Sequence, residues 1–283
     1  MANESRIGPE VEAWTQRLLP GTLWETQTCS ALPDLLLLQG VGQAVPGYLT
    51  PSCPSTMDVA WALIREDRFP EFAWILTMDQ TRGRGQFGRP WDQGIGNLYA
   101  SVRLPDRAAA GRLTTPLAVG GILADALGAE RLPVEIKWPN DLLVGGKKIG
   151  GILIEEKQGR VVAGIGINIK TRPEPGTQAR AYRIQAGSLS EFGNPVDAPG
   201  LWQQIIRCFR EGLPTLLAQP ETIREKVEQI LAFKDESVLV EQGNGENRPA
   251  RIMGIHGNGG LVIQTPAGRQ VLESGRIIPR IEI

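Results

Sequence analysis

Residues 79–91, with the sequence DQTRGRGQFGRPW, concentrate chemical groups that bind anions. The ten residues that start at Arg82 include three glycines and three arginines. Glycines let successive backbone N–H groups converge on one anion, and an arginine guanidinium holds a carboxylate or a phosphate through two parallel hydrogen bonds. Three interpretations compete: a flexible RNA-binding tail, a dinucleotide-binding loop and an ordered anion site.

The spacing of Gly83, Gly85 and Gly88 matches the dinucleotide-binding fingerprint, and a predicted strand at 72–78 precedes it. That fingerprint requires a helix to follow directly, because the helix N-terminus faces the pyrophosphate. Here Pro90, two more glycines and a predicted strand follow instead, so this interpretation fails. Disordered Arg/Gly tails occur in long low-complexity tracts, which disfavours the tail. An ordered anion site remains, with a solvated basic turn as the alternative.

A second segment whose side chains could take part in binding or catalysis is KWPNDLLVGGKKIGGILIEE, residues 137–156. Its central Gly-Gly pair predicts a hairpin turn, after which Lys147 and Lys148 begin the returning strand. Neighbouring strand residues point to opposite faces, so one of these two lysines shares a face with apolar residues and needs an anionic partner. Gly150 and Gly151 would then let a ligand approach the backbone. For Asp141, a plain turn residue is the open alternative.

The elements that must position these residues follow a mixed order along the chain. The sequence predicts a helix that starts at Ser55 or Thr56, where either residue caps it. The other expected elements are strands at 72–78, 97–104 and 161–169, a hairpin over 134–156, and helices at 115–129, 199–217 and 220–231. From Ala232 onward short strands alternate with Gly-rich turns, which predicts a small all-β barrel. The predicted division is therefore an N-terminal extension of unclear role at 1–48, a main domain at 49–231 and the barrel at 232–283.

Composition excludes several classes of function. The 283 residues carry a formal net charge of −1, so no global basic field attracts nucleic acid or an anionic membrane. The three cysteines lack metal-type spacing and His256 is the single histidine, which argues against a metal site held by the protein alone. No signal peptide and no membrane-length apolar run is evident. We therefore expect a cytoplasmic protein with reduced thiols and no nucleic-acid or membrane partner.

Several motifs, taken in order, resemble the biotin–protein ligases. The resemblance rests on Ser55 with Thr56, the 80–91 run, NLY at 97–99, KWPND at 137–141, KIGGILIE at 148–155 and GIGIN at 164–168, and it covers about residues 50 to 170. It implies an α+β fold, with a mixed sheet and flanking helices like the catalytic domain of class II aminoacyl-tRNA synthetases, followed by a C-terminal SH3-like β-barrel. Residues 1–48 do not resemble the winged helix of the repressor members, which implies a form without DNA-binding function.

The chemistry implied by this resemblance has two steps. The carboxylate of biotin attacks ATP, with Mg²⁺, to give biotinyl-5′-AMP and pyrophosphate. A lysine of the biotin carboxyl carrier protein of acetyl-CoA carboxylase then takes the biotinyl group as an amide, and AMP leaves. A lipoate–protein ligase of the same fold is the alternative function, and whether the chain forms a homodimer stays open.

The resemblance also implies roles for individual residues. The implied catalytic residues are Lys148, Arg84 and Asp141, with Mg²⁺ bound to ATP near Asp141. The implied biotin-binding residues are Ser55, Thr56, Met57, Gln80, Gly83, Arg84, Gly85, Gln86 and Lys148. The implied residues for ATP and the adenylate are Arg84, Arg89, Trp91, Lys148 and Asn168.

Three positions depart from the family pattern. Arg82 precedes the Gly/Arg run, where the family usually has a small residue. Met57 stands where the family commonly has asparagine, and Gln86 stands where it often has a third arginine of the Gly/Arg run. The effect of Met57 and Gln86 on retention of the intermediate is left open.

Overall fold

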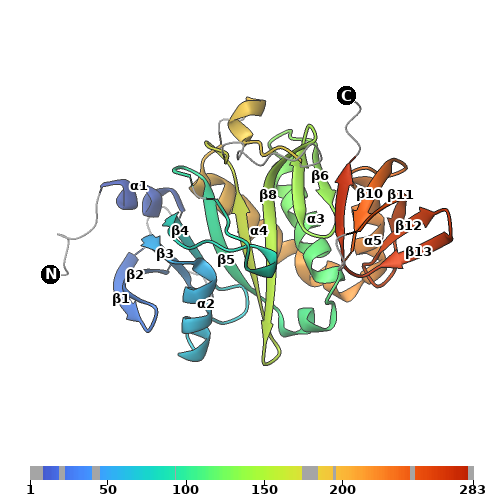
Figure 1. Cartoon of the computed structure of the whole chain (residues 1–283). Coiled ribbons are helices and arrows are strands. Elements are labelled where there is room, and N and C mark those ends of the chain that lie inside the picture. Colours follow the sequence, from blue (N-terminus) through green and yellow to red (C-terminus); the bar gives the residue numbers. More distant parts are fainter. Residues whose placement is uncertain are drawn as a thin grey trace.

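A computed structural model describes residues 9–18, 23–39, 45–92, 94–173, 184–193, 196–242 and 246–279. Two β-sheets with flanking helices make up this part of the chain (Figure 1). The strands of the C-terminal sheet, orange to red in Figure 1, lie beside the end of the large sheet that holds β6. None of the described helices is long and apolar enough to cross a membrane.

The large sheet has nine strands in the order β1-β2-β3-β4-β5-β9-β8-β7-β6. Only β3 and β4 run parallel among its neighbouring strands, so the sheet is mixed. Because β3 and β4 are parallel, their carboxyl ends meet at one edge, with Cys53 paired to Gln80. The strands are β1 (Leu23–Cys29), β2 (Leu32–Gln39), β3 (Gly47–Cys53), β4 (Trp74–Gln80), β5 (Leu98–Leu104), β6 (Val134–Lys137), β7 (Asp141–Val144), β8 (Lys147–Lys157) and β9 (Arg160–Ile167).

Helices cover both faces of this sheet, because its central strands carry apolar residues on both sides. In β4, Ile75 joins one buried cluster while Trp74 and Leu76 join the other, as the alternation of a strand requires. The first cluster holds α2 (Thr56–Arg65), and the second holds α1 (Pro9–Leu18), α3 (Thr114–Gly128), α4 (Ala198–Ala218) and α5 (Pro220–Gln229). Single turns of 3₁₀ helix form at η1 (Gln86–Gly88), η2 (Asp106–Ala110) and η3 (Leu189–Phe192).

The C-terminal sheet is antiparallel, with five strands in the order β13-β12-β11-β10-β14. It packs closely on the main domain: the indole Nε1 of Trp138 donates to the carbonyl oxygen of Gly259 at 3.0 Å. A Cβ on Gly259 would lie 2.6 Å from the carbonyl carbon of Leu113, so only glycine permits this approach. Its strands are β10 (Ser237–Glu241), β11 (Asn247–Ile255), β12 (Leu261–Thr265), β13 (Gly268–Leu272) and β14 (Arg276–Pro279).

The predicted fold class, a mixed sheet with flanking helices and a C-terminal all-β domain, is confirmed. The N-terminal segment had no predicted role, and the structure places β1 and β2 at the edge of the large sheet, with Leu36 paired to Leu49. The first predicted helix does begin at Thr56, with Ser55 at the N-cap position. The Ser55 side chain makes no capping hydrogen bond, however, so helix capping does not explain why residue 55 is a serine.

Candidate active site

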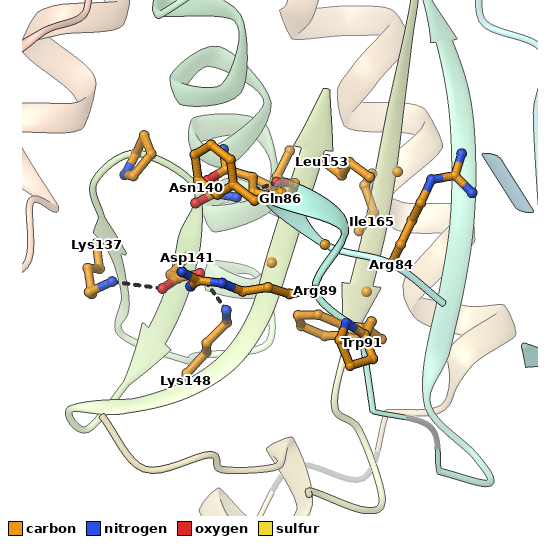
Figure 2. A pocket seen from close by; sticks show the side chains of 18 of the residues that line it. Arg84, Gln86, Arg89, Trp91, Lys137, Asn140, Asp141, Lys148, Leu153 and Ile165 are labelled. Carbon is orange, nitrogen blue, oxygen red and sulfur yellow. Dashed lines mark hydrogen bonds and ion pairs between the residues drawn. The ribbon is translucent and has the colours of Figure 1, made fainter. Parts of the chain in front are cut away.

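A cavity of about 890 Å³ opens where the carboxyl ends of β3 and β4 meet β8, β9 and residues 82–91, here called the Gly/Arg loop (Figure 2). Its size lies within the ordinary range for small-molecule sites. The lining residues come from both sheets, so the C-terminal sheet helps to close the cavity. Those to which the family resemblance gave roles are Ser55, Thr56, Met57, Gln80, Arg84, Gly85, Gln86, Arg89, Trp91, Asp141 and Lys148.

Buried hydroxyl and amide groups form a polar end of the cavity. The side-chain oxygen of Gln80 accepts from the backbone N–H of Thr56 at 3.0 Å and from its hydroxyl at 3.3 Å. Ser101 in turn donates to the Thr56 hydroxyl at 2.8 Å. These bonds fix the Gln80 amide, and a ligand with both donor and acceptor atoms would be complementary to it and to Ser55.

Trp91 lies flat against the backbone of β8 and β9. An added Cβ on Gly151 would come within 2.9 Å of its ring, and one on Gly166 within 2.7 Å, so both positions need glycine. The sequence predicted that Gly150 and Gly151 would let a ligand approach the backbone, and in this structure the Trp91 ring occupies the space beside Gly151. The Trp91 Nε1 is buried and has no hydrogen-bond partner among the described residues. The indole thus forms one wall of the cavity.

Asp141 bridges two lysines at the opposite end of the cavity. Its Oδ1 lies 2.6 Å from Nζ of Lys148, and its Oδ2 lies 2.9 Å from Nζ of Lys137 (Figure 2). Burial raises the pKa of Asp141, but the two ammonium groups outweigh burial and hold that pKa below its ordinary value. Asp141 therefore stays ionised and fixes both ammonium groups. The ammonium of Lys148 also lies 5.2 Å from the centre of the Trp91 ring.

The two adjacent lysines of β8 diverge as the strand alternation predicts. Lys148 lines the cavity, whereas Lys147 pairs with Glu191 at 2.7 Å outside the lining. The sequence analysis assigned the ligand-facing position to Lys148, and the structure places that side chain in the cavity.

Arg84 and Arg89 point in different directions. Arg84 reaches Asp58 of α2 at 2.8 Å and Glu155 of β8 at 3.0 Å, so its guanidinium links the loop to a helix and a strand. Burial lowers the pKa of Arg84, but the two carboxylates outweigh burial and raise it. Arg89 is exposed and extends in the direction of Asp141 and Lys148, on the other side of the loop from Arg84 (Figure 2).

Three residues with predicted ligand-binding roles make close contacts within the protein. Gly83 lies behind the lining: a Cβ there would meet the side-chain nitrogen of Gln80 at 2.5 Å. The backbone N–H of Gly85 donates to the carbonyl oxygen of Arg89 at 2.8 Å, so this N–H is engaged in a hydrogen bond within the loop itself. Asn168 is buried outside the lining, where its amide donates to the carbonyl oxygen of Gly187 at 3.1 Å. Its nucleotide contact stays a prediction.

Known proteins resemble this chain in both sequence and structure. A profile described as the biotin/lipoate A/B protein ligase family matches residues 49–171. A biotin–acetyl-CoA-carboxylase ligase of Paracoccus denitrificans is 29% identical over 219 residues, which are 72% of this chain and 89% of that relative. The chain belongs to the biotin/lipoate A/B protein ligase family.

Further members of the family agree with this placement. The bifunctional ligase/repressor BirA of Bacillus subtilis is 34% identical over 153 residues, and the match spans 50% of this chain and 46% of that protein. The structure of the biotin protein ligase from Aquifex aeolicus in complex with biotin and ATP aligns with a TM-score of 0.71 and 26% identity. That alignment covers 82% of this chain and 97% of the other.

The C-terminal sheet contributes cavity residues that the sequence analysis missed. Glu241 at the end of β10 and Arg276 at the start of β14 both line the cavity and lie 3.5 Å apart. Both follow the last family motif by more than seventy positions, and no motif surrounds them. Their residue types alone are weak signals, since charged side chains are common at strand ends. Lys137 and Asn140 also line the cavity, within a motif that the sequence analysis quoted without assigning them roles.

Among the residues that the structure describes, no three His, Cys, Asp or Glu side chains gather to hold a metal ion. Asp141 and Glu241 are the carboxylates of the cavity lining, and each is paired with a cation.

Replacing Asp141 by asparagine should change how stability depends on pH. The folded pKa of Asp141 lies below its ordinary value of about 3.9, so its ionised form stabilises the fold fully above that pH. This stabilisation is lost as pH falls through the folded pKa. The free energy of unfolding of D141N should therefore decline less steeply than that of the wild type below about pH 4. Urea unfolding at a series of acidic pH values measures both slopes, and equal slopes would contradict the prediction.

Proposed function

We propose that this protein is an ATP-dependent biotin–protein ligase that forms biotinyl-5′-AMP and transfers the biotinyl group to a lysine. One observation carries the proposal: a single cavity has a buried polar end at Ser55, Thr56 and Gln80 and a cationic end at Lys137 and Lys148. A ring such as the ureido ring of biotin, with N–H donors and a carbonyl acceptor, suits the first end. A carboxylate and a polyphosphate suit the second.

In the first step, an oxygen of the biotin carboxylate attacks the α-phosphorus of ATP, and pyrophosphate leaves. Two anions must approach each other, so fixed positive charge is the main requirement of the site. Lys148 supplies it, because Asp141 holds its ammonium group in place before the substrates bind. Arg89, which extends in the same direction, is a second cation for the phosphates.

In the second step, the lysine amine of the acceptor attacks the acyl carbon, the amide bond forms and AMP leaves. The mixed anhydride must survive until the acceptor arrives, so water has to be kept from it. Trp91 suits this task, because its flat ring lies on the glycines of β8 and β9 and forms a wall of the cavity.

Mg²⁺ fits this site as a companion of ATP. Mg²⁺ in proteins commonly binds one or two carboxylates together with substrate phosphates. Asp141 is the carboxylate that would meet it, since it already lies at the cationic end of the cavity. When bound, Mg²⁺ would neutralise part of the phosphate charge.

The proposed acceptor is a biotin carboxyl carrier protein of a carboxylase, as the name of the Paracoccus relative suggests. A cytoplasmic location agrees with the three cysteines, all of which are free thiols.

Biotin and lipoate should differ sharply as substrates. The names of the Paracoccus ligase and of the Aquifex structure specify biotin, which leaves lipoate less supported. With ATP and Mg²⁺, biotin should stimulate pyrophosphate release and lipoate should not. A continuous pyrophosphate assay without acceptor protein measures this step alone. Stimulation by lipoate and not by biotin would replace the proposal with the lipoate ligase.

Arg276→Gln should weaken the use of ATP more than the use of biotin. The polar end of the cavity is built before residue 102, whereas Arg276 adds a cation from the C-terminal sheet. Loss of one charge-assisted hydrogen bond to phosphate should raise the KM for ATP by about tenfold. R269Q is the control, because Arg269 is an exposed arginine on β13, at the opposite edge of the same sheet. Steady-state pyrophosphate release gives both KM values, and a larger change for biotin would place Arg276 elsewhere.

A further inference from the structure

Glu155 of β8 lies outside the cavity lining, but on the same face of the strand as two residues of that lining. Gly151 and Leu153 line the cavity, and β8 pairs with β9 without a register shift from Gly150 to Lys157. Alternate residues of a regular strand share a face, so Glu155 continues this row two residues further along. It ends the family motif at 148–155, in which no role was predicted for it.

The carboxylate of Glu155 meets side chains from two other elements. Nε1 of Trp61, a buried residue of α2, donates to one carboxylate oxygen at 2.8 Å. The guanidinium of Arg84 reaches the other oxygen, from Nε at 3.1 Å and from Nη2 at 3.0 Å. Burial raises the pKa of Glu155, but Trp61, Arg84 and the exposed Lys157 outweigh burial and hold that pKa below its ordinary value. Glu155 is therefore ionised at neutral pH and joins α2 and the Gly/Arg loop to β8.

The backbone hydrogen bonds inside the Gly/Arg loop join the loop to itself. The N–H of Trp91 donates to the carbonyl oxygen of Gly83 at 2.9 Å, and that of Gly85 donates to the carbonyl oxygen of Arg89 at 2.8 Å. Residues 87–90 at the tip are exposed. Segments with exposed tips and few buried contacts open locally at low free energy, so the loop depends on side chains that fasten it to neighbouring elements.

We infer that Glu155 is a positioning residue, which fixes Arg84 and thereby holds the Gly/Arg loop at the cavity. Asp58 also meets Arg84, but its side chain is 52% exposed, against 22% for Glu155. Water competes for an exposed ion pair, which therefore contributes little. Glu155 is better shielded, and the hydrogen bond from Trp61 keeps its carboxylate in one orientation before Arg84 arrives.

Hydrogen exchange in the ligand-free full chain tests this role without an activity assay. Glu155→Gln keeps the size of the side chain and still accepts from Trp61, but it lacks the charge that Arg84 meets. Loss of a charge-assisted hydrogen bond should speed amide exchange of residues 82–91 by about tenfold. E156Q is the matched control, since Glu156 is the next residue of β8, exposed and on the opposite face. Equal loop exchange in the two variants would overturn the inference.

Arg84→Met removes the other partner of the same ion pair and separates a local effect from a general loss of stability. R84M alone should speed exchange of the loop about as much as E155Q does. Because Glu155 acts on the loop through Arg84, the double variant R84M/E155Q should exchange like R84M. If E155Q accelerated loop exchange equally with and without Arg84, Glu155 would support the fold through Trp61, and the inference would be wrong.

A kinetic consequence of the same change rests on the proposed ligase function. The loop bears Arg89 and Trp91, to which that function gives roles, so a displaced loop should misplace both. E155Q should lower kcat for biotin-dependent pyrophosphate release by about tenfold or more, and E156Q should not. An unchanged kcat in E155Q would contradict the positioning role. Absence of release from the wild type would count against the ligase function alone, because hydrogen exchange needs no substrate and still decides whether Glu155 holds the loop.

Discussion

Lys148→Gln should lower biotin-dependent ATP–pyrophosphate exchange by about 10²–10³-fold, the usual effect of removing one preorganised group that stabilises developing charge. Lys148 is preorganised because Asp141 holds its ammonium group at 2.6 Å inside the cavity. Glutamine retains hydrogen-bonding groups but carries no charge to bring a carboxylate and a phosphate together. Exchange of radiolabelled pyrophosphate into ATP measures the first chemical step without acceptor protein.

Lys147→Gln is the internal control for this experiment. Lys147 precedes Lys148 on β8, but its ammonium pairs with Glu191 and lies outside the cavity lining. An exposed ion pair contributes only about 0–1 kcal/mol, so K147Q should keep nearly the full exchange rate. If K147Q lost as much activity as K148Q, the assignment of the two strand faces would have to be redrawn.

Arg84→Lys should reduce formation of the adenylate by at least about tenfold, although the charge is retained. The guanidinium of Arg84 reaches Asp58 and Glu155 at the same time and thereby joins the Gly/Arg loop to α2 and β8. A lysine ammonium cannot span two carboxylates with that fixed fork. The loop should then lose its fixed position over the cavity, with the effect concentrated on the chemical step. Single-turnover formation of biotinyl-5′-AMP by rapid quench measures that step.

Arg82→Lys provides the comparison at the same loop. Arg82 lies two residues before Arg84 and is exposed. R82K should therefore behave like the wild type, while circular dichroism and the melting temperature show whether R84K has kept its fold. A well-folded R84K with wild-type rates would mean that Arg84 neither fixes the loop nor contacts the substrates.

Local features of the sequence determined the element types and much of the candidate site. Gly145 and Gly146 have positive φ angles at the predicted hairpin turn, a conformation that glycine adopts readily. The alternation of side chains along β8 is enough by itself to send Lys147 and Lys148 to opposite faces. Residues of the Gly/Arg loop and of the 137–156 segment do meet in one cavity. The turn and the alternation depend on neighbours along the chain, so the sequence alone contains them.

The tertiary structure decided where distant segments meet. It turned Arg84 toward Asp58 and Glu155, which lie on two different elements, and placed Asn168 behind the cavity wall. It brought Arg276 to a site whose motifs end more than a hundred residues earlier. It also added β1 and β2 to the sheet. Such contacts depend on strand order and on packing between whole elements, and no periodicity within a single segment specifies either.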